Sequence, residues 1–327
     1  MWGRYFRERN ILVTGGTGSF GYQIITRLID FKPARIVVFS RDEKKQYDMR
    51  NEFEGCDLLD FVLGDVRDYN SVYVAMKGID IVYHAAALKQ VPNCEFYPLE
   101  AVKTNILGAE NVRMAALENG AERVVSISTD KAVKPVNVMG MTKAIQERIM
   151  LRSVEKGYTT KFICVRYGNV IGSRGSVIPF FKERLERGAF LPVTDFEMTR
   201  FLLTLDQAVD LVFRATVEGE SGQIFVRKMP ACKIIDLARA MAKEVTGRDD
   251  YPIKEVGIRP GEKIHEVLVS EEEMLRSVET KTHYVIYPHG KLKKPKLLSN
   301  LREYTSNHTK MLNEREIVSL LKKEGWL

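Results

Sequence analysis

A glycine-rich turn near the amino terminus constrains the fold of this 327-residue chain more than any other feature. The apolar run Ile11–Thr14 leads directly into GGTGSFG, in which Gly15, Gly18 and Gly21 have the spacing G-x-x-G-x-x-G. Glycines so placed allow a tight turn, a close approach of the backbone to a pyrophosphate, and close packing of a helix on the strand. Because a strand precedes the turn and a helical pattern follows it, the motif predicts a dinucleotide site; a purely structural turn is the alternative. We expect the cofactor phosphates to meet Gly15, Thr17, Gly18, Ser19, Phe20 and Gly21.

Short β-branched runs alternate with longer amphipathic segments over the first two-thirds of the chain. Continuous apolar strands that alternate with helices are typical of a parallel sheet covered on both faces. We therefore predict an α/β fold, a Rossmann-type doubly wound parallel sheet with a smaller, mainly helical C-terminal substrate lobe. The expected strands are 11–14, 35–40, 61–63, 79–83, 123–128 and 162–166, and the expected helices are 101–118, 139–155, 179–187, 205–217 and 234–246.

The alternation of strands and helices fades after about Gly172. This change predicts a Rossmann domain in residues 1–172, which later segments can join, and a substrate-binding lobe in residues 173–280 that holds the last three expected helices. Residues 281–327 are expected to form a basic arm closed by a short helix from Asn313.

The net charge of +7 belongs almost entirely to this arm. From Lys281 to the last residue, ten Lys and Arg stand against four Asp and Glu, which accounts for six of the seven charges. The lysines of the arm lack the interleaved aromatic residues of a nucleic-acid surface, so we predict no nucleic-acid partner.

The cysteines and the lengths of the apolar runs indicate the cellular compartment of the protein. Cys56, Cys94, Cys164 and Cys232 lie too far apart for a CxxC metal motif, so we predict free thiols and no metal site. No apolar run approaches the roughly 18 residues that a membrane span needs, and no signal peptide is visible. We expect a cytoplasmic protein with no membrane partner.

The end of the second expected strand indicates which dinucleotide binds. An acidic residue here favours NAD, because it binds the ribose 2′-hydroxyl. The hydroxyl of Ser40 and the guanidinium of Arg41 instead suit a 2′-phosphate and favour NADP. The alternative is that Arg41 is a solvated charge and Asp42 is the ribose ligand.

Two later strand ends complete the predicted cofactor site. Asp65 and Val66 follow the third strand, where the carboxylate could accept a hydrogen bond from the adenine amino group. Ala85 and Ala86 end the fourth strand in small side chains, which leave room for the cofactor.

Further motifs extend from the first strand to about Leu268. They are FSRDEKKQ (39–46), GDVRD (64–68), HAAALKQVP (84–92), STDKAV (128–133), RYGNVIGSRGSVIPFF (166–181), MTRF (198–201) and RPGEKIHE (259–266). With these motifs the chain resembles the extended short-chain dehydrogenases/reductases. It is most similar to the UDP-N-acetylglucosamine 4,6-dehydratases of surface-polysaccharide synthesis, and in particular to the capsule-type 4,6-dehydratase/5-epimerase branch.

The chain departs from the wider superfamily at one catalytic position. The usual Y-x-x-x-K motif supplies a tyrosine that removes an alcohol proton, but here Met139 stands in its place, four residues before Lys143. A thioether cannot accept that proton. One interpretation is loss of activity; the other is that the base has moved to the adjoining Thr129-Asp130-Lys131, and one branch of the family resembles this chain in having Met here.

The resemblance implies a role for each residue of this group. Asp130 would protonate the leaving O6 hydroxyl, Lys131 would remove the C5 proton, and Thr129 would bond to the C4 oxygen. Lys143 would hold the nicotinamide ribose, and either Lys143 or a water in the space left by Met139 would take the C4 hydroxyl proton. The alternative for Asp130 and Lys131 is a surface ion pair beyond the end of a strand.

The resemblance also implies a substrate and the residues that bind it. The sequence predicts an NADP-dependent UDP-N-acetylglucosamine 4,6-dehydratase, with inversion at C5 favoured over retention, in a homo-oligomer. A UDP-hexose C4 epimerase and a non-catalytic NADP sensor are the further alternatives. The expected substrate-binding residues are Lys89, Asn169, Arg174, Val177, Arg200, Arg259 and Glu262.

Overall fold

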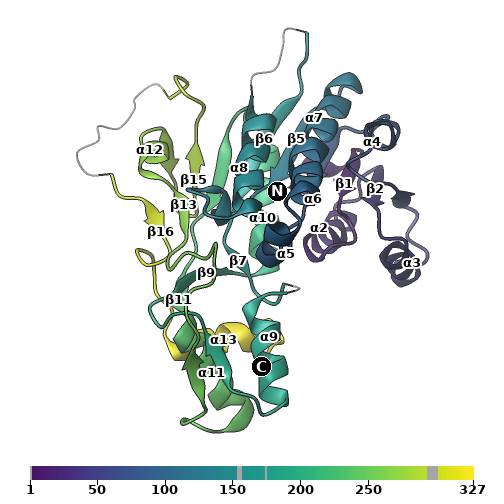
Figure 1. Ribbon diagram of the computed structural model, residues 1–327. Helices are drawn as coiled ribbons and strands as arrows, with labels where there is room; N and C mark the ends of the chain where they lie inside the picture. Colours follow the sequence, from purple (N-terminus) through teal and green to yellow (C-terminus); the bar gives the residue numbers. More distant parts are fainter. Residues whose placement is uncertain (1, 153–156, 174, 293–300) are drawn as a thin grey trace.

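A nine-stranded sheet forms the centre of the protein in the computed structural model, which describes residues 2–152, 157–173, 175–292 and 301–327 (Figure 1). The strand order is β14-β15-β10-β6-β5-β4-β1-β2-β3. The six expected strands are present and parallel, each within two residues of its expected bounds. They are β1 (Asn10–Thr14), β2 (Arg35–Ser40), β3 (Leu59–Leu63), β4 (Ile81–His84), β5 (Arg123–Ile127) and β6 (Lys161–Arg166). The predicted Rossmann-type α/β fold is confirmed.

Three strands from later in the chain extend this sheet. β10 (Ile224–Arg227) pairs in parallel with β6, β15 (His283–Ile286) pairs antiparallel with β10, and β14 (Ser277–Glu279) pairs antiparallel with β15 and forms the edge of the sheet. The sheet therefore draws on segments that the sequence division assigns to the lobe and to the arm.

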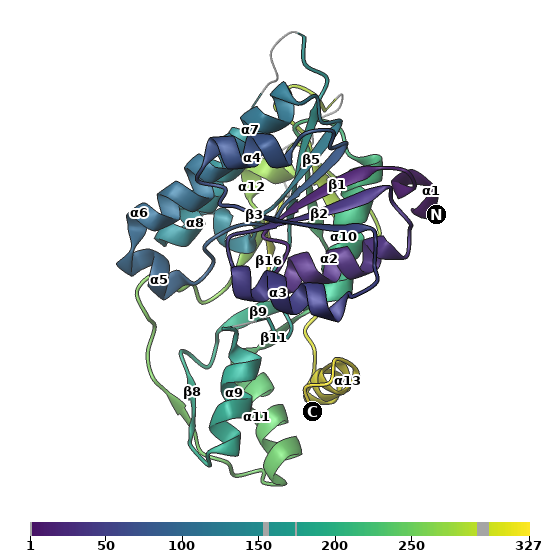
Figure 2. The ribbon, with the colours of Figure 1, turned by 90° about the vertical axis from the view of Figure 1, so that its right-hand side faces the viewer.

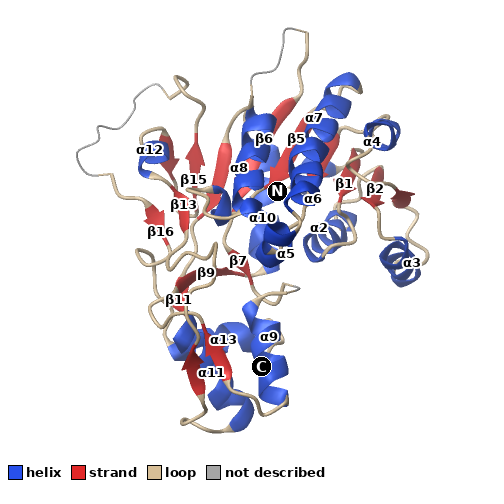
Figure 3. Ribbon diagram, viewed as in Figure 1, coloured by secondary structure: helices blue, strands red, loops and turns tan. Residues whose placement is uncertain are grey.

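Helices cover both faces of the sheet, as its nearly continuous apolar strands require (Figures 2 and 3). On one face α7 (Gly108–Glu118) packs against α4 (Tyr69–Ala75) and α8 (Val138–Leu151). On the other face α2 (Ser19–Ile29) packs against α10 (Leu205–Glu218), and α3 (Glu43–Glu52) lies beside β3.

The position of α10 corrects one expectation. The helix was expected in the second lobe, but its buried residues Val209, Val212 and Phe213 belong to the core of the main sheet. Helical periodicity identifies an apolar face, but it does not show which layer that face covers.

A second apolar core lies below the sheet in the view of Figure 1. It joins α9 (Val177–Glu186), α11 (Ile234–Thr246) and α13 (Glu314–Lys323), and Asn313 caps α13 as expected. Short strands accompany these helices: β7 (Asn169–Val170), β8 (Leu191–Val193), β9 (Thr199–Leu203), β11 (Ala231–Lys233) and β12 (Ile253–Glu255). The lobe is thus more mixed than the mainly helical lobe that periodicity predicted.

The remaining elements are short. They are α1 (Gly3–Phe6), α5 (Val91–Phe96), α6 (Pro98–Ala101), the π-helix η1 (Val102–Leu107), the 3-10 turn η2 (Asp130–Ala132), β13 (Val267–Val269), α12 (Glu271–Met274) and β16 (Tyr304–Thr305). Of the basic residues in the arm, Lys293, Lys294 and Lys296 lie outside the described residues.

None of the helices in the described ranges is both long and apolar enough to cross a membrane.

Candidate active site

The predicted cofactor residues gather where the strand order of the sheet reverses. β1 lies between β2 and β4, so the turn after β1 and the end of β4 face each other at the carboxyl edge. Such a reversal is where open α/β sheets bind their ligands.

The glycine turn leaves no room for a side chain at Gly15 or Gly21. Gly15 has a φ of 67°, and a Cβ there would lie 2.9 Å from backbone atoms of Ala86. A Cβ on Gly21 would lie 2.5 Å from the carbonyl oxygen of Gly15. Gly18 caps α2 without a side-chain hydrogen bond, which leaves the first N–H groups of the helix available to an anion. These residues fit a dinucleotide whose pyrophosphate lies on this turn.

The predicted 2′-phosphate residues lie beside the turn. The hydroxyls of Ser40 and Thr17 are 2.8 Å apart, and the half-exposed Arg41 lies 3.4 Å from Asp65. Asp42, the alternative ribose ligand, instead caps α3 by accepting a hydrogen bond from the backbone N–H of Lys45.

Asp65 is held by a second arginine. The Arg67 side chain donates to its Oδ2 at 2.9 and 2.7 Å. Although partial burial opposes the effect, these bonds keep the pKa of Asp65 below its usual value, so the carboxylate is an acceptor. The neighbouring Val66 is buried and touches Gly108 closely enough to exclude a Cβ there.

The predicted acid and base lie together just beyond β5. Lys131 Nζ donates to Asp130 Oδ1 at 3.0 Å, and Thr129 Oγ1 donates to the same oxygen at 2.8 Å. Asp130 is fully buried, and its Oδ2 has no hydrogen-bond partner in the described part of the chain. Burial raises the pKa of Asp130, which favours a protonated acid. This geometry argues against a solvated surface ion pair.

Three charged groups that lie far from this pair in the sequence surround it. Glu266 Oε1 lies 3.3 Å from Lys131 Nζ and 3.8 Å from Arg200 Nε, and Glu266 Oε2 lies 4.0 Å from Lys263 Nζ. Although burial favours the neutral amine, Asp130 and Glu266 keep the pKa of Lys131 above its usual value. Of these groups, the sequence singled out only Arg200 in advance, as a substrate ligand. Glu266 was visible only as the last residue of RPGEKIHE.

Met139 and Lys143 occupy the first turns of α8. Met139 is buried in a small apolar cluster with Cys94 and Ala101. Lys143 Nζ donates to the Ile127 carbonyl and to Gln146 Oε1, and burial lowers the pKa of Lys143 to about 8. A lysine in this state can donate to a ribose hydroxyl and exchange a proton near neutral pH.

A glycine brings α8 up to the acid–base turn. A Cβ on Gly140 would lie 2.3 Å from the Lys131 carbonyl oxygen, so only glycine allows this contact. The π-helix η1 provides a second support, because the buried Asn105 bonds to both backbone groups of Leu88 and to Thr142 Oγ1 of α8. The expected single helix over 101–118 is interrupted here, and a π turn of this kind is frequent at functional sites.

The predicted substrate residues are only partly brought together. Arg200 reaches the acid–base group, where it also donates to the carbonyls of Thr199 and Ile264. Asn169 Oδ1 and Glu262 Oε2 are buried atoms without hydrogen-bond partners among the described residues, as expected of groups that await a ligand.

The other substrate candidates are Lys89, Arg259, Val177 and Arg174. Lys89 and Arg259 are exposed, Val177 is the first residue of α9, and Arg174 lies outside the described residues. Their assignment to the substrate remains a prediction.

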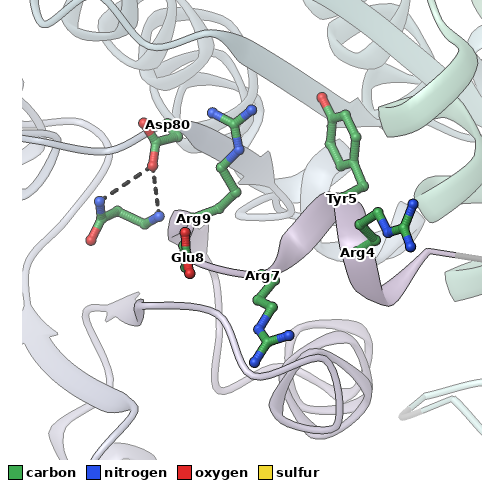
Figure 4. A pocket seen from close by; sticks show the side chains of 7 residues that line it. Arg4, Tyr5, Arg7, Glu8, Arg9 and Asp80 are labelled. Carbon is green, nitrogen blue, oxygen red and sulfur yellow. Dashed lines mark hydrogen bonds between the residues drawn. The ribbon is translucent and has the colours of Figure 1, made fainter.

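A concave surface elsewhere carries none of the predicted residues. It has a volume of about 770 Å³ and lies at the amino-terminal edge of the sheet, beside α1 (Figure 4). Its wall includes Asp80, which accepts two hydrogen bonds from Asn10 at the start of β1. This surface lies at the opposite edge of the sheet from the acid–base turn.

Comparison with known proteins places the whole chain in one group. The model of the family described as "Polysaccharide biosynthesis protein" matches residues 11–288. A UDP-glucose 4-epimerase of Rickettsia conorii is 45% identical over 334 aligned positions, which cover 97% of this chain and 96% of that protein.

Solved structures agree on the fold. The X-ray structure of Pen from Bacillus thuringiensis superposes with a TM-score of 0.93 at 36% identity, over 99% of both chains. DesIV, a dTDP-glucose 4,6-dehydratase from Streptomyces venezuelae solved with NAD, superposes with a TM-score of 0.70 over 78% of this chain and 86% of its own. At 21% identity DesIV supports the fold alone.

Proposed function

The chain belongs to the polysaccharide biosynthesis protein family, and from this premise we propose that it is an NADP-dependent UDP-N-acetylglucosamine 4,6-dehydratase. It would make a 4-keto-6-deoxy sugar nucleotide for a surface glycan, with inversion at C5. One observation carries the proposal: a buried carboxyl and a lysine, Asp130 and Lys131, share a hydrogen bond just beyond β5, the strand whose Ile127 carbonyl accepts from Lys143.

Dehydration needs an acid and a base that act on adjacent carbons. NADP bound on the glycine turn would supply the hydride acceptor for oxidation at C4 and the hydride donor for reduction at C6, and Lys143 or a water in the space left by Met139 would take the C4 hydroxyl proton. The 4-ketone acidifies the C5 proton, which Lys131 would remove, and Asp130 would protonate O6 as it leaves. The two side chains are already in contact, so the transfer of one proton from Lys131 Nζ to Asp130 Oδ1 prepares both for these roles.

The other residues of the site would bind and orient the two ligands. Thr129 would donate to the C4 oxygen, and Lys143 would hold the nicotinamide ribose through Nζ. The partnerless Asn169 and Glu262 would bind the nucleotide sugar, together with Lys89, Arg174, Val177, Arg200 and Arg259.

NADP is proposed because Arg41 is half-exposed beside the turn, whereas Asp42 is used as a helix cap. Replacing Arg41 by Ala is expected to weaken NADP binding by about 10–100-fold, the usual effect of losing one charge-assisted hydrogen bond. Binding of NAD, which has no 2′-phosphate, should be nearly unchanged.

Titration calorimetry with both dinucleotides measures this preference. Arg35→Ala removes a similarly exposed arginine at the start of β2 and serves as the matched control. If the Arg41 variant loses the same affinity for NADP and for NAD, the arginine does not bind the 2′-phosphate.

A UDP-hexose 4-epimerase is the second candidate function, because the Rickettsia relatives carry that name. Both reactions need a base for the C4 hydroxyl proton, which buried Met139 cannot supply, so Lys143, whose pKa is lowered to about 8, or a water would take that proton in either case. Only a dehydratase has a use for an acid at O6, and the buried Asp130 therefore favours dehydration over epimerisation.

One incubation separates these functions. The purified protein is mixed with UDP-N-acetylglucosamine, and separately with UDP-glucose, in D2O, and the sugars are followed by NMR. A dehydratase gives a 4-keto-6-deoxy product with deuterium at C5 and no net NADPH, and the coupling constants report whether C5 is inverted or retained. A galacto-configured product without deuterium would establish the epimerase instead, and unchanged sugars would leave only the sensor.

We further propose a cytoplasmic homo-oligomer. The four cysteines are free thiols, three of them buried, which suits a reducing compartment. Several large apolar side chains on α5 and α6 are exposed, including Phe96 and Leu99, which suits contact with a second copy.

A further inference from the structure

Glu266 is the buried carboxylate that faces the proposed acid–base pair from another part of the chain. Only 2% of its surface is exposed, and it lies directly before β13. Its Oε1 is 3.3 Å from Lys131 Nζ, so the ammonium lies between Oε1 and Asp130 Oδ1. No residue role argued above uses this carboxylate.

The backbone of Glu266 is fixed by two neighbouring segments. Its N–H donates to Ser306 Oγ at 2.9 Å, and its carbonyl accepts from the Ser306 N–H at 2.9 Å. Ser306 Oγ in turn lies 2.6 Å from Thr199 Oγ1 at the start of β9. These bonds hold the carboxylate in one place, as a residue that orients a catalytic group requires.

The charged groups around Glu266 come from three segments. Asp130 and Lys131 belong to η2, Arg200 belongs to β9, and Lys263 lies in the loop that leads to β13. Although burial opposes the effect, the three cations keep the pKa of Glu266 below its usual value. Glu266 is therefore a fixed negative charge beside the pair, and it counts among the causes that raise the pKa of both Asp130 and Lys131.

We propose that Glu266 is a positioning residue that holds Lys131 against Asp130 and retains the single proton that these two side chains share. The inference rests on the proposed dehydratase function. In its reactive form the pair is a carboxylic acid and a neutral amine. The amine takes the proton from C5, the C–H electrons form the C5–C6 double bond, and the C6–O6 electrons leave with O6, which takes the carboxyl proton to become water.

The charge of the pair is the same before and after this step. The pair begins as carboxyl and amine and ends as carboxylate and ammonium. A second proton would block the base, and loss of the shared proton would remove the acid. The elimination therefore has a bell-shaped dependence on pH, with one limb for each of these changes.

Replacing Glu266 by Gln tests the role with little change in shape. Without the negative charge both protons are held less tightly, so both limbs of the kcat profile are expected to move to lower pH by about 1–3 units, the usual effect of one charge at this distance. Glu266→Asp keeps the charge and should restore the profile. Lys263→Met removes a positive charge beside Glu266 and should move both limbs the other way.

Chemical labelling of Lys131 measures the titration of its amine without any enzymatic turnover. The protein is acetylated competitively over a range of pH, and the Lys131 peptide is quantified by mass spectrometry. The labelling midpoint is expected to fall in Glu266→Gln and to rise in Lys263→Met. If the wild type forms no keto sugar but these midpoints still move, the positioning role stands and the dehydratase function alone fails.

Glu273→Gln is the matched control, because Glu273 is equally buried but pairs with Arg166. This substitution should change neither the two limbs of the kcat–pH profile nor the pH midpoint of Lys131 acetylation. A Glu266→Gln enzyme that loses activity with unmoved limbs and an unmoved Lys131 midpoint would overturn the proposal and leave Glu266 a purely structural residue.

Discussion

Replacement of Asp130 by Asn is expected to slow dehydration of UDP-N-acetylglucosamine by about 10²–10⁴-fold, the usual contribution of a general acid. The amide has nearly the same shape but cannot give a proton to the leaving O6. Because Asp130 is fully buried and bonded to Thr129 and Lys131, the group is already oriented, and a solvent acid cannot easily replace it. The rate is measured by NMR of the 4-keto-6-deoxy product.

Two controls separate loss of chemistry from loss of structure. NADP binding to the Asp130 variant should be unchanged, since the glycine turn follows a different strand. Asp60→Asn, on the exposed edge of β3, should keep full activity. Normal turnover in Asp130→Asn would remove Asp130 from the mechanism. A parallel loss of NADP affinity would instead indicate damage to the fold.

Replacement of Arg166 by Met is expected to lower the free energy of unfolding by about 3–5 kcal/mol. Arg166 on β6 donates to Glu147 of α8 at 2.7 and 2.6 Å, and to Glu273 of α12 at 2.8 Å through two nitrogens. All three side chains are at most 8% exposed. Without the guanidinium, two carboxylates stay buried with no cation between them, which is the most costly way to break such a group.

Urea unfolding measures this loss, and a triple variant tests its cause. When Glu147 and Glu273 are also replaced by Met, no charge is left uncompensated, and most of the stability should return. A loss below about 1 kcal/mol in the single variant would mean that water reaches the carboxylates. This group joins α8 to α12, the helix that follows β13.

Local features of the sequence predicted the sheet and the cofactor turn. The glycine spacing, the apolar runs and the residues at strand ends depend only on residues close in the sequence, so they can be recognised without knowing the tertiary structure. The six parallel strands lie within two residues of their expected positions, and the turn at Gly15 excludes side chains as its spacing implied. The family resemblance pointed to Asp130 and Lys131, and their place just beyond the end of a strand agrees with it.

The environment of those residues was decided by the tertiary structure alone. Glu266 lies more than a hundred residues after Lys131 along the chain, and only the packing of β13 against η2 brings the two together. Tertiary packing also decided the position of α10, because its periodicity did not show which layer it covers. It likewise brought β10, β14 and β15 back to the main sheet. The sequence by itself determined the identity of the acid and base candidates. Their burial and charge pairing depend on residues that only folding brings into contact with them. The fold decided how firmly each would hold its proton.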